Sequence, residues 1–244
     1  MDDLNAMTPL SEGDVTPQPY LRSPCLSPRG HRIAFSYAGD IWVVPRKGGE
    51  ARLLTSHPEY DDCPRFSPDG RSLAFTSYRT GNGDLYVLSL ANGTLRRLTY
   101  HDGENLLEAW SPDGQWLYFN SGQEMIGSEI YKVSLAGGTP IRVLGDPYEA
   151  YYHVALSPDG RRMAFNNNGD RWWRRGPNPN APSDIWVADE PSRPRNFRKV
   201  TDYAGRNLWP LWDAAGEGLY FVSDRGGRRT CGTNPYAPGR RPAK

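Results

Sequence analysis

The chain has 244 residues with a formal net charge of +1, and 37% of its residues are hydrophobic. This composition is ordinary for a globular protein, and the length suffices for one large domain or two small ones. The near-zero charge argues against a nucleic-acid binder or a protein of anionic membrane surfaces, since both usually carry a strong basic bias. We therefore expect no nucleic-acid partner and no membrane partner.

Residues 1–18 are polar, contain Pro9 and Pro17 and show no periodicity, so we expect a disordered lead-in. The N-terminus has no basic segment followed by an apolar one, and no apolar run approaches the length of a membrane span. These features predict a cytoplasmic location. The three cysteines lack Cys-x-x-Cys spacing, which argues against both a disulfide framework and a zinc site.

From residue 19 to residue 227 one phrase recurs: Ser-Pro-Asp-Gly, two variable residues, then three apolar residues. Full copies begin at Ser67, Ser111 and Ser157, a looser copy with Arg29 in place of Asp begins at Ser27, and a divergent fifth copy begins at Asp213. In this phrase Pro presets φ for a turn, Asp can accept a hydrogen bond from the backbone two residues on, and Gly supplies a positive φ. Each copy therefore predicts a β-hairpin turn.

Each turn belongs to a longer unit of four short strands. The strand before the turn alternates inward and outward and ends on a large apolar residue such as Phe66, which predicts a core position. The strand after the turn is the apolar triplet, and the fourth strand is a short edge strand such as Leu95–Thr99. The third strand opens with an acidic residue, which is Asp40, Asp84, Glu129 or Asp184 in successive units.

The spacing of these units predicts the architecture. Successive turn glycines lie 40, 44 and 46 residues apart, and the blades of β-propellers repeat about every 40–45 residues. The next spacing is 56 residues, so the fourth unit carries an insertion between Asn166 and Ser183. No helical periodicity is present. The predicted fold is all-β, a β-propeller of four-stranded antiparallel blades, with four complete blades and a partial fifth of a six-bladed type.

The repeated phrase resembles the TolB-type propeller repeat. Over most of its length the chain is most similar to the N-terminal six-bladed propeller of tricorn-like serine proteases, on three passages: Tyr20–Pro24, Gly39–Pro45 and Arg171–Gly176. The resemblance implies a non-catalytic propeller that serves substrate access or peptide docking, separated here from its peptidase domain. It leaves open whether the chain acts as an enzyme, and it carries no catalytic residue over.

Two other functions stay open, a stand-alone TolB-like interaction propeller and the N-terminal propeller of a prolyl-oligopeptidase-like hydrolase. The sequence contains no Gly-x-Ser-x-Gly elbow and no clear nucleophile–base constellation. We therefore expect no catalytic residue, no metal and no cofactor in this chain. The expected partner is a peptide substrate or another protein.

The insertion of the fourth blade is the one candidate binding site. Its residues are Arg171, Trp172, Trp173, Arg174 and Arg175. Guanidinium groups and indole rings suit an extended peptide or its terminal carboxylate, through bidentate hydrogen bonds and stacking. The alternative is that the tryptophans pack on a neighbouring blade.

Other polar residues recur once per blade and predict structural roles. His57 and His101 occupy equivalent places in two blades, so they are expected to shape loops and not to share a metal. The acid at the start of each third strand is expected to accept backbone hydrogen bonds at that strand start.

The pattern stops after Gly227, and residues 228–244 are rich in Arg and Pro, which predicts an irregular tail. Back-translation of Arg228–Asn234 in a frame shifted by one base gives Ala-Glu-Asn-Leu-Trp-Tyr-Glu, which matches the expected third strand. Our hypothesis is that a frameshift created this tail. A propeller that stops in its fifth blade leaves sheet edges without partners, so we also expect self-association.

Overall fold

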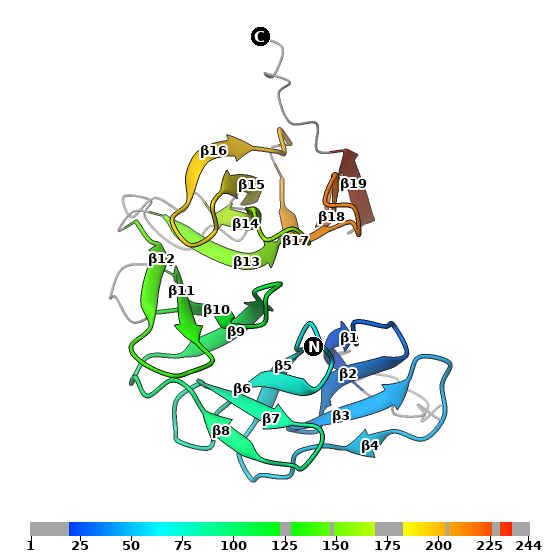
Figure 1. Ribbon diagram of the computed structural model, residues 1–244. Coiled ribbons are helices and arrows are strands. Elements are labelled where there is room, and N and C mark those ends of the chain that lie inside the picture. The colour runs from blue at the N-terminus through cyan, green and yellow to red at the C-terminus, as the bar shows by residue number, and fades with distance from the viewer. Residues whose placement is uncertain are drawn as a thin grey trace, which may run out of the picture.

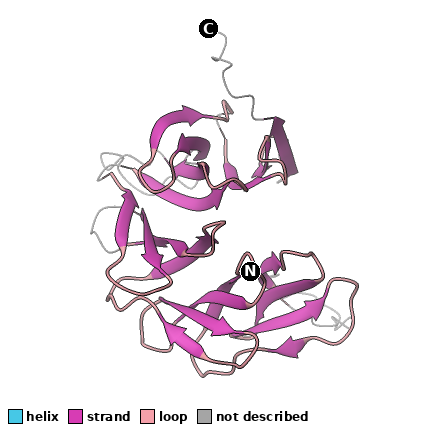
Figure 2. Ribbon diagram, viewed as in Figure 1, coloured by secondary structure: helices cyan, strands magenta, loops and turns pink. Residues whose placement is uncertain are grey.

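The computed structural model describes residues 20–122, 128–146, 149–168, 183–203, 205–225 and 230–235. These residues form five antiparallel sheets that follow one another around an arc (Figure 1). Strands and loops make up the whole of this part (Figure 2), so it contains no helix that could cross a membrane. Each sheet is one blade, and the predicted all-β propeller is confirmed.

The four strands of a complete blade are hydrogen-bonded in chain order. The complete blades are blade one, β1 (Arg22–Leu26), β2 (Arg32–Tyr37), β3 (Asp40–Pro45) and β4 (Arg52–Leu53); blade two, β5 (Asp61–Phe66), β6 (Ser72–Ser77), β7 (Asp84–Ser89) and β8 (Leu95–Arg97); blade three, β9 (Asn105–Trp110), β10 (Trp116–Ser121), β11 (Glu129–Ser134) and β12 (Ile141–Leu144); and blade four, β13 (Ala150–Leu156), β14 (Arg162–Asn168), β15 (Ser183–Asp189) and β16 (Arg195–Lys199). Blade five contains β17 (Asn207–Trp212), β18 (Gly218–Ser223) and β19 (Thr230–Pro235).

The repeated phrase forms the turn between the first two strands of each blade, as predicted. In blade two the Gly70 N–H donates to the Ser67 carbonyl (2.8 Å), and Gly70 has a φ of +70°. The Asp69 carboxylate accepts the N–H of Arg71 (3.0 Å) and the hydroxyl of Ser67 (2.6 Å). The same hydroxyl oxygen accepts the N–H of Ser72 (2.9 Å). The serine hydroxyl thus closes the hairpin, and its hydrogen bond lowers the pKa of Asp69.

The turn proline of one blade lies against the turn glycine of the next. A Cβ atom placed on Gly70 would lie 3.5 Å from Pro28 Cδ, and one placed on Gly216 would lie 3.3 Å from Pro158 Cδ. The same contact joins the glycines Gly114 and Gly160 to the prolines Pro68 and Pro112. The repeated turn therefore aligns consecutive blades as well as shaping each hairpin.

The apolar triplet after the turn packs on both neighbouring blades. In blade two, Leu73 and Phe75 join a core cluster with Ala34 of blade one. Ala74 points to the other face and joins a cluster with Leu117 and Phe119 of blade three. Each core cluster in the described residues lies between two consecutive blades, so no blade buries its apolar surface alone.

A buried polar residue follows the triplet and bridges to the inner strand of the next blade. These residues are Ser36, Thr76, Asn120 and Asn166. The Thr76 hydroxyl donates to the Asn105 carbonyl (3.2 Å) and accepts the Leu107 N–H (2.9 Å). The Asn120 side chain donates to the Tyr151 carbonyl (2.6 Å). These bridges add directional hydrogen bonds to the apolar contacts between blades.

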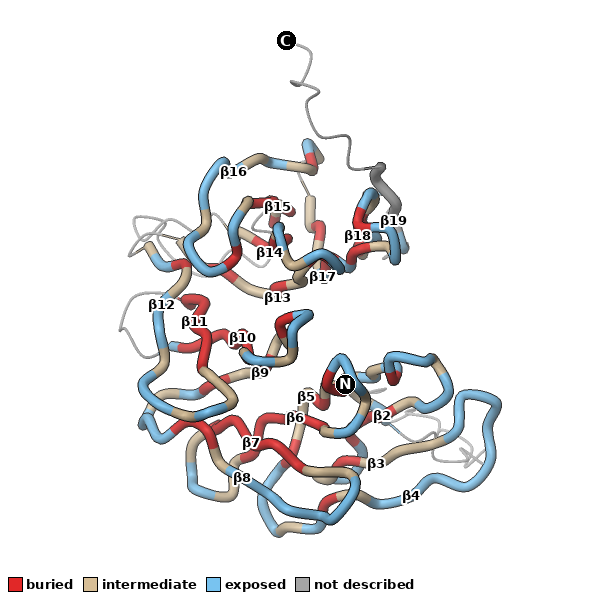
Figure 3. Tube along the Cα trace, viewed as in Figure 1, coloured by how far each residue is buried: buried red, intermediate tan, exposed pale blue. Residues whose placement is uncertain are grey.

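The first and last blades leave apolar side chains exposed. Leu26 is 55% exposed, whereas its equivalents Phe66 and Trp212 are buried. The expectation of a core position is therefore wrong for Leu26, because the face of blade one that carries it has no preceding blade in the described chain. Leu211 and Tyr220 of blade five are 62% and 45% exposed. Burial is concentrated in the middle strands of the blades, and the outer strands β4 and β8 are largely exposed (Figure 3).

The chain after Gly227 differs from the sequence-based expectation. Within the segment predicted to be an irregular tail, Thr230–Pro235 forms β19, which pairs antiparallel with β18 over six residue pairs. The physical reason is that β18 presents a free row of backbone groups, and a segment with two threonines can supply the partner strand. Blade five therefore has a third strand, which we did not expect from the sequence.

Candidate functional site

The predicted binding residues Arg171–Arg175 lie outside the described residues. The strands on either side of that insertion are paired to their ends, because Asn168 of β14 lies opposite Ser183 of β15. At this end of the blade the side-chain Oδ1 atoms of Asn167 and Asn168 are buried and accept no hydrogen bond from the described residues.

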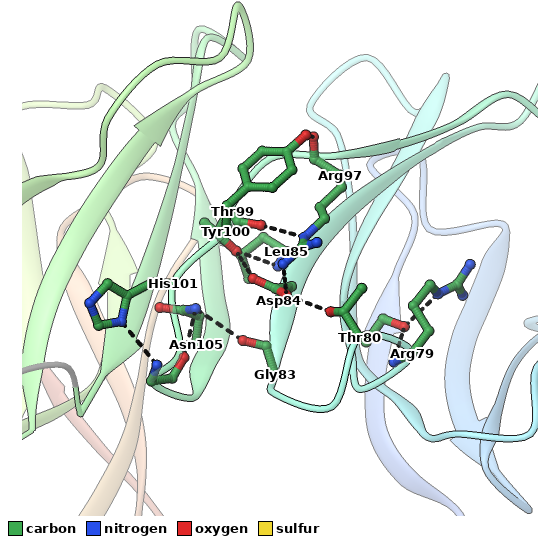
Figure 4. A network of polar contacts seen from close by, with 12 residues as sticks. Arg79, Thr80, Gly83, Asp84, Leu85, Arg97, Thr99, Tyr100, His101 and Asn105 are labelled. Atoms are coloured by element: carbon green, nitrogen blue, oxygen red, sulfur yellow. Dashed lines mark hydrogen bonds and ion pairs between the residues drawn. The ribbon is translucent and has the colours of Figure 1, made fainter.

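The recurring acids have the structural role predicted for them at the start of the third strand, but they reach its backbone through a threonine hydroxyl and do not accept the backbone N–H directly. The Asp84 carboxylate accepts the Thr99 hydroxyl (2.9 Å), whose oxygen accepts the Leu85 N–H (2.9 Å; Figure 4). The other oxygen of the Asp84 carboxylate pairs with Arg97 (2.7 Å) and accepts the Thr80 hydroxyl (2.7 Å). The same acid, threonine and backbone amide recur in two further blades, as Asp40, Thr55 and Ile41 and as Asp184, Thr201 and Ile185.

Blade three replaces this arrangement with a longer acid and a smaller partner. Glu129 stands where the other blades have Asp, and Gly145 stands where they have Thr. The Glu129 carboxylate accepts the Tyr131 hydroxyl (2.8 Å) and pairs with Arg142 (3.3 Å). A Cβ atom on Gly145 would lie 2.3 Å from Glu129 Oε1, so the extra length of the acid occupies the space of the threonine.

His57 and His101 have the structural role predicted for them. His57 Nδ1 accepts the Glu59 N–H (3.1 Å), and His101 Nδ1 accepts the Gly103 N–H (2.9 Å). Each imidazole therefore closes a local turn two residues further along its own loop. Among the described residues no group of three or more His, Cys, Asp or Glu side chains is arranged to hold a metal.

The inner strands contain a recurring bulge that the simple inward–outward alternation did not predict. Ser23, Cys63, His153 and Trp209 occupy equivalent positions, each with a φ between +50° and +55°. The register of the first hairpin shifts at each of these places. A left-handed conformation costs a residue other than glycine roughly 1–3 kcal/mol and is found most often at functional sites.

Side chains stabilise these bulges by accepting the displaced backbone amides. The His153 N–H donates to Glu108 Oε1 (3.0 Å), and the Trp209 N–H donates to Asn166 Oδ1 (3.0 Å). In both cases the acceptor belongs to the preceding blade. The Cys63 N–H donates to the Asp62 carboxylate (2.7 Å). The bulges at His153 and Trp209 therefore depend on contacts between blades, whereas the acceptor at Cys63 lies in the same strand.

Glu108, Arg65 and His153 form a cluster that joins blades two, three and four. Arg65 Nε donates to the Glu108 carbonyl (2.9 Å), and Glu108 Oε1 lies 3.9 Å from His153 Nδ1. The His153 ring lies 5.4 Å from the ring of Trp209, which is 47% exposed. This cluster is the candidate site that the described residues provide, and its sequence signal was weak because its members come from three different repeats.

Burial shifts the pKa values of the ionisable groups at this cluster. Cys63 also belongs to this cluster, because its thiol interacts electrostatically with Arg65 and Glu108. Burial raises the pKa of Cys63 to about 11, so its thiol is protonated near neutral pH and is a poor nucleophile. Burial and the nearby Arg65 lower the pKa of His153 to about 4, so its ring is neutral. Burial also raises the pKa of Glu108 to about 7.

The blades and their shared turn define a β-propeller with TolB-type repeats. A family model of the tricorn protease N-terminal beta propeller domain matches residues 18–233. The chain therefore belongs to the family of tricorn protease N-terminal propeller domains, as the resemblance of its repeats predicted.

Similarity to an individual tricorn protease homologue extends over only a short segment of this chain. Tricorn protease homolog 1 of Streptomyces coelicolor is 40% identical over 62 residues, which are 25% of this chain and 6% of that protein. The matched segment is thus a small fraction of the relative's own length.

Two solved structures show the same fold. TolB from Acinetobacter baumannii has a TM-score of 0.70 at 22% identity, with 89% of this chain and 52% of that chain covered. The crystal structure of the tricorn protease has a TM-score of 0.69 at 23% identity, with 89% of this chain and 22% of that chain covered. At these identities the similarity is one of fold.

Blade three has Glu129 and Gly145 where the other blades have Asp and Thr. We therefore predict that substitutions at these two positions are coupled in their effect on stability. Gly145→Thr alone should lower the free energy of unfolding by about 1–3 kcal/mol, because the buried Glu129 must give up its hydrogen bonds. Gly145→Thr combined with Glu129→Asp should recover most of this loss by recreating the pair found in the other blades. Denaturant unfolding measures both, and purely additive losses would contradict the interpretation.

The cluster around Glu108 predicts a pH-dependent stability. Folding raises the pKa of Glu108 from 4.5 to about 7, so its contribution to stability is fully present below pH 4.5 and is lost as the pH rises through 7. Glu108→Gln keeps an acceptor for the His153 N–H and removes the buried charge. At pH 8 it should therefore raise the free energy of unfolding by about 1–3 kcal/mol.

Denaturant unfolding at pH 8 and pH 5 tests this expectation. The gain should shrink at pH 5, where Glu108 is protonated in the folded protein. The pKa of His153 changes in the opposite direction, from 6.5 to about 4, so its protonation weakens folding only at acid pH and leaves the comparison at pH 8 clear. Glu59→Gln, at an exposed loop position, is the matched control. A destabilised Glu108→Gln variant at pH 8 would overturn the assignment.

Proposed function

We propose that this propeller is a non-catalytic docking domain that binds peptide or protein substrates for a tricorn-type serine peptidase. In this proposal the bond-breaking residues belong to a separate peptidase domain. The propeller supplies a rigid frame, and its loops and inner strands contact the substrate. Membership of the tricorn N-terminal propeller family supports the proposal.

The observation that carries the proposal is the chemistry of the inner-strand cluster. Its thiol is protonated, its imidazole is neutral, and its backbone bulges present the partly exposed ring of Trp209. An exposed aromatic ring on strained but well-supported backbone suits contact with extended peptide. The same groups lack the activated nucleophile that acyl transfer requires.

The insertion of blade four is the second part of the proposal. Arg171–Arg175 would bind the peptide by stacking and by bidentate hydrogen bonds to carboxylates. The Oδ1 atoms of Asn167 and Asn168, which are buried beside the start of the insertion, accept no hydrogen bond from the described residues. Sequence and chemistry support this role, which rests on residues outside the described part.

Peptide binding by the chain tests the proposal. Fluorescence anisotropy with labelled peptides from a casein digest should show saturable binding, and mass spectrometry of the same mixtures should show no cleavage products. The double variant Trp172→Ala/Arg174→Ala should bind at least about tenfold more weakly, a loss of 1.4 kcal/mol. The control is Arg52→Ala on the exposed strand β4, which should bind like the unmodified chain. Unchanged binding by the insertion variant would refute the docking role of the insertion, and cleavage products would refute the non-catalytic role.

We also propose that the chain of 244 residues associates with itself through the exposed faces of blades one and five. Leu26 lies on the face that other blades turn toward a preceding blade, and Leu211 and Tyr220 are exposed on blade five. Between consecutive blades, one face of a blade packs on the opposite face of the next blade. The exposed faces of blades one and five are of these two kinds, so they can pack on each other in the same way.

Sedimentation velocity tests the self-association. The unmodified chain should form larger species as its concentration rises. Leu26→Lys and Leu211→Lys should each reduce the average mass, because they place a charge in the proposed contact. Far-ultraviolet circular dichroism checks that both variants fold. A monomer at every concentration would contradict the proposal.

A further inference from the structure

A cavity of about 960 Å³ opens on the turn side of blade four. One wall is the turn between β13 and β14, from Asp159 to Arg162, and the other is the loop that joins β15 to β16. Ligand pockets in proteins have volumes of about 300–1,000 Å³, so the space is sufficient for several residues of a peptide. The insertion that follows Asn168 begins at the opposite end of β14, and none of its residues lines this cavity among the described residues.

Arginine dominates the lining of this cavity. Five arginines line it against three carboxylates; the arginines are Arg161, Arg162, Arg193, Arg195 and Arg198, and the carboxylates are Asp159, Asp189 and Glu190. The surplus of positive charge is local, because the chain as a whole carries a net charge of only +1. A local surplus favours a compact anionic ligand over a long nucleic acid, which needs an extended basic surface.

Two of the five arginines have fixed structural roles. Arg198 pairs with Asp189 (2.8 Å). Arg162 donates to the Gly216 carbonyl (2.8 Å) and lies over the Trp212 ring, 4.9 Å from its centroid. These contacts fix the walls of the cavity and leave the remaining three arginines to be considered as ligand contacts.

The other three arginines are available to a ligand. In the part of the chain that the structure describes, the guanidinium groups of Arg161 and Arg193 form no hydrogen bond or ion pair, and both residues are exposed. Arg195 pairs with Glu190, but both side chains are about half exposed. An exposed ion pair contributes about 0–1 kcal/mol, so a ligand carboxylate can replace Glu190 at little cost.

We propose that this cavity binds an acidic segment of a peptide or protein, through the guanidinium groups of Arg161, Arg193 and Arg195. Each group can hold one carboxylate by two parallel hydrogen bonds. Asn196 also lines the cavity; its side-chain nitrogen donates to Asp189 (3.1 Å), and its side-chain oxygen can accept a hydrogen bond from the peptide backbone. The proposed site does not involve the insertion, so it stands or falls independently of the docking role proposed above.

Fluorescence anisotropy at low salt tests the site. The probe is a fluorescein-labelled Gly-Ser peptide with a central run of glutamates, and the comparison peptide has glutamine at each of those positions. The chain should bind the glutamate peptide at least about tenfold more tightly. Arg161→Ala and Arg193→Ala should each remove most of this preference, whereas Glu190→Gln should strengthen binding because it removes the internal competitor.

Arg71→Ala is the matched control, because Arg71 follows the glycine of the turn in blade two as Arg161 does in blade four. The control should bind the glutamate peptide like the unmodified chain. Equal binding of the two peptides, or an equal loss in the Arg71→Ala control, would overturn the proposal. Displacement of the peptide by equimolar inorganic phosphate would also overturn it, since the site would then select phosphate. Retained binding in Trp172→Ala/Arg174→Ala separates this result from the test of the insertion.

Discussion

The hydroxyl group of the turn serine holds the first hairpin of a blade in register. In blade three, Ser111 Oγ accepts the N–H of Trp116 (2.9 Å) and donates to the Asp113 carboxylate. The strand that follows carries Leu117 and Phe119 toward one neighbouring blade and Tyr118 toward the other. A shift of one residue would exchange these faces, so the packing of three blades depends on this turn.

The mutual dependence of the blades also determines where binding is possible. The strands form the contacts between blades, so binding falls to the loops and to the surfaces around the turns and the inner-strand bulges. The bulge at His153 exists because Glu108 of the preceding blade accepts its N–H. The arginine-lined cavity likewise depends on a turn and a loop that blade four holds at fixed separation. The repeated strands therefore provide the frame, and the side chains that differ between repeats provide the candidate sites.

The sequence predicted the repeated features and missed those that depend on spatial neighbours. Turn, triplet and strand-opening acid could be predicted because local spacing and turn chemistry determine them. The polar residue after the triplet, as in Thr76, recurs visibly in the sequence, but its bridge to the next blade could be recognised only in the structure. The left-handed bulge at Cys63 breaks the expected alternation, and no single residue type marks it. β19 was missed because its pairing depends on the open edge of β18 and not on its own pattern.

The most direct test of the central role of the turn is native-state hydrogen exchange on Ser111→Ala. The substitution leaves the partly buried Trp116 N–H without its side-chain acceptor, so we expect the free energy of unfolding to fall by about 1–3 kcal/mol. Amides of β9, β10 and the facing strands of blades two and four should lose protection together. Ser134→Ala, which removes an exposed turn contact to the Ala136 N–H, is the control and should change neither quantity. Unchanged stability and protection in Ser111→Ala would contradict the dependence of the blades on this hydroxyl group.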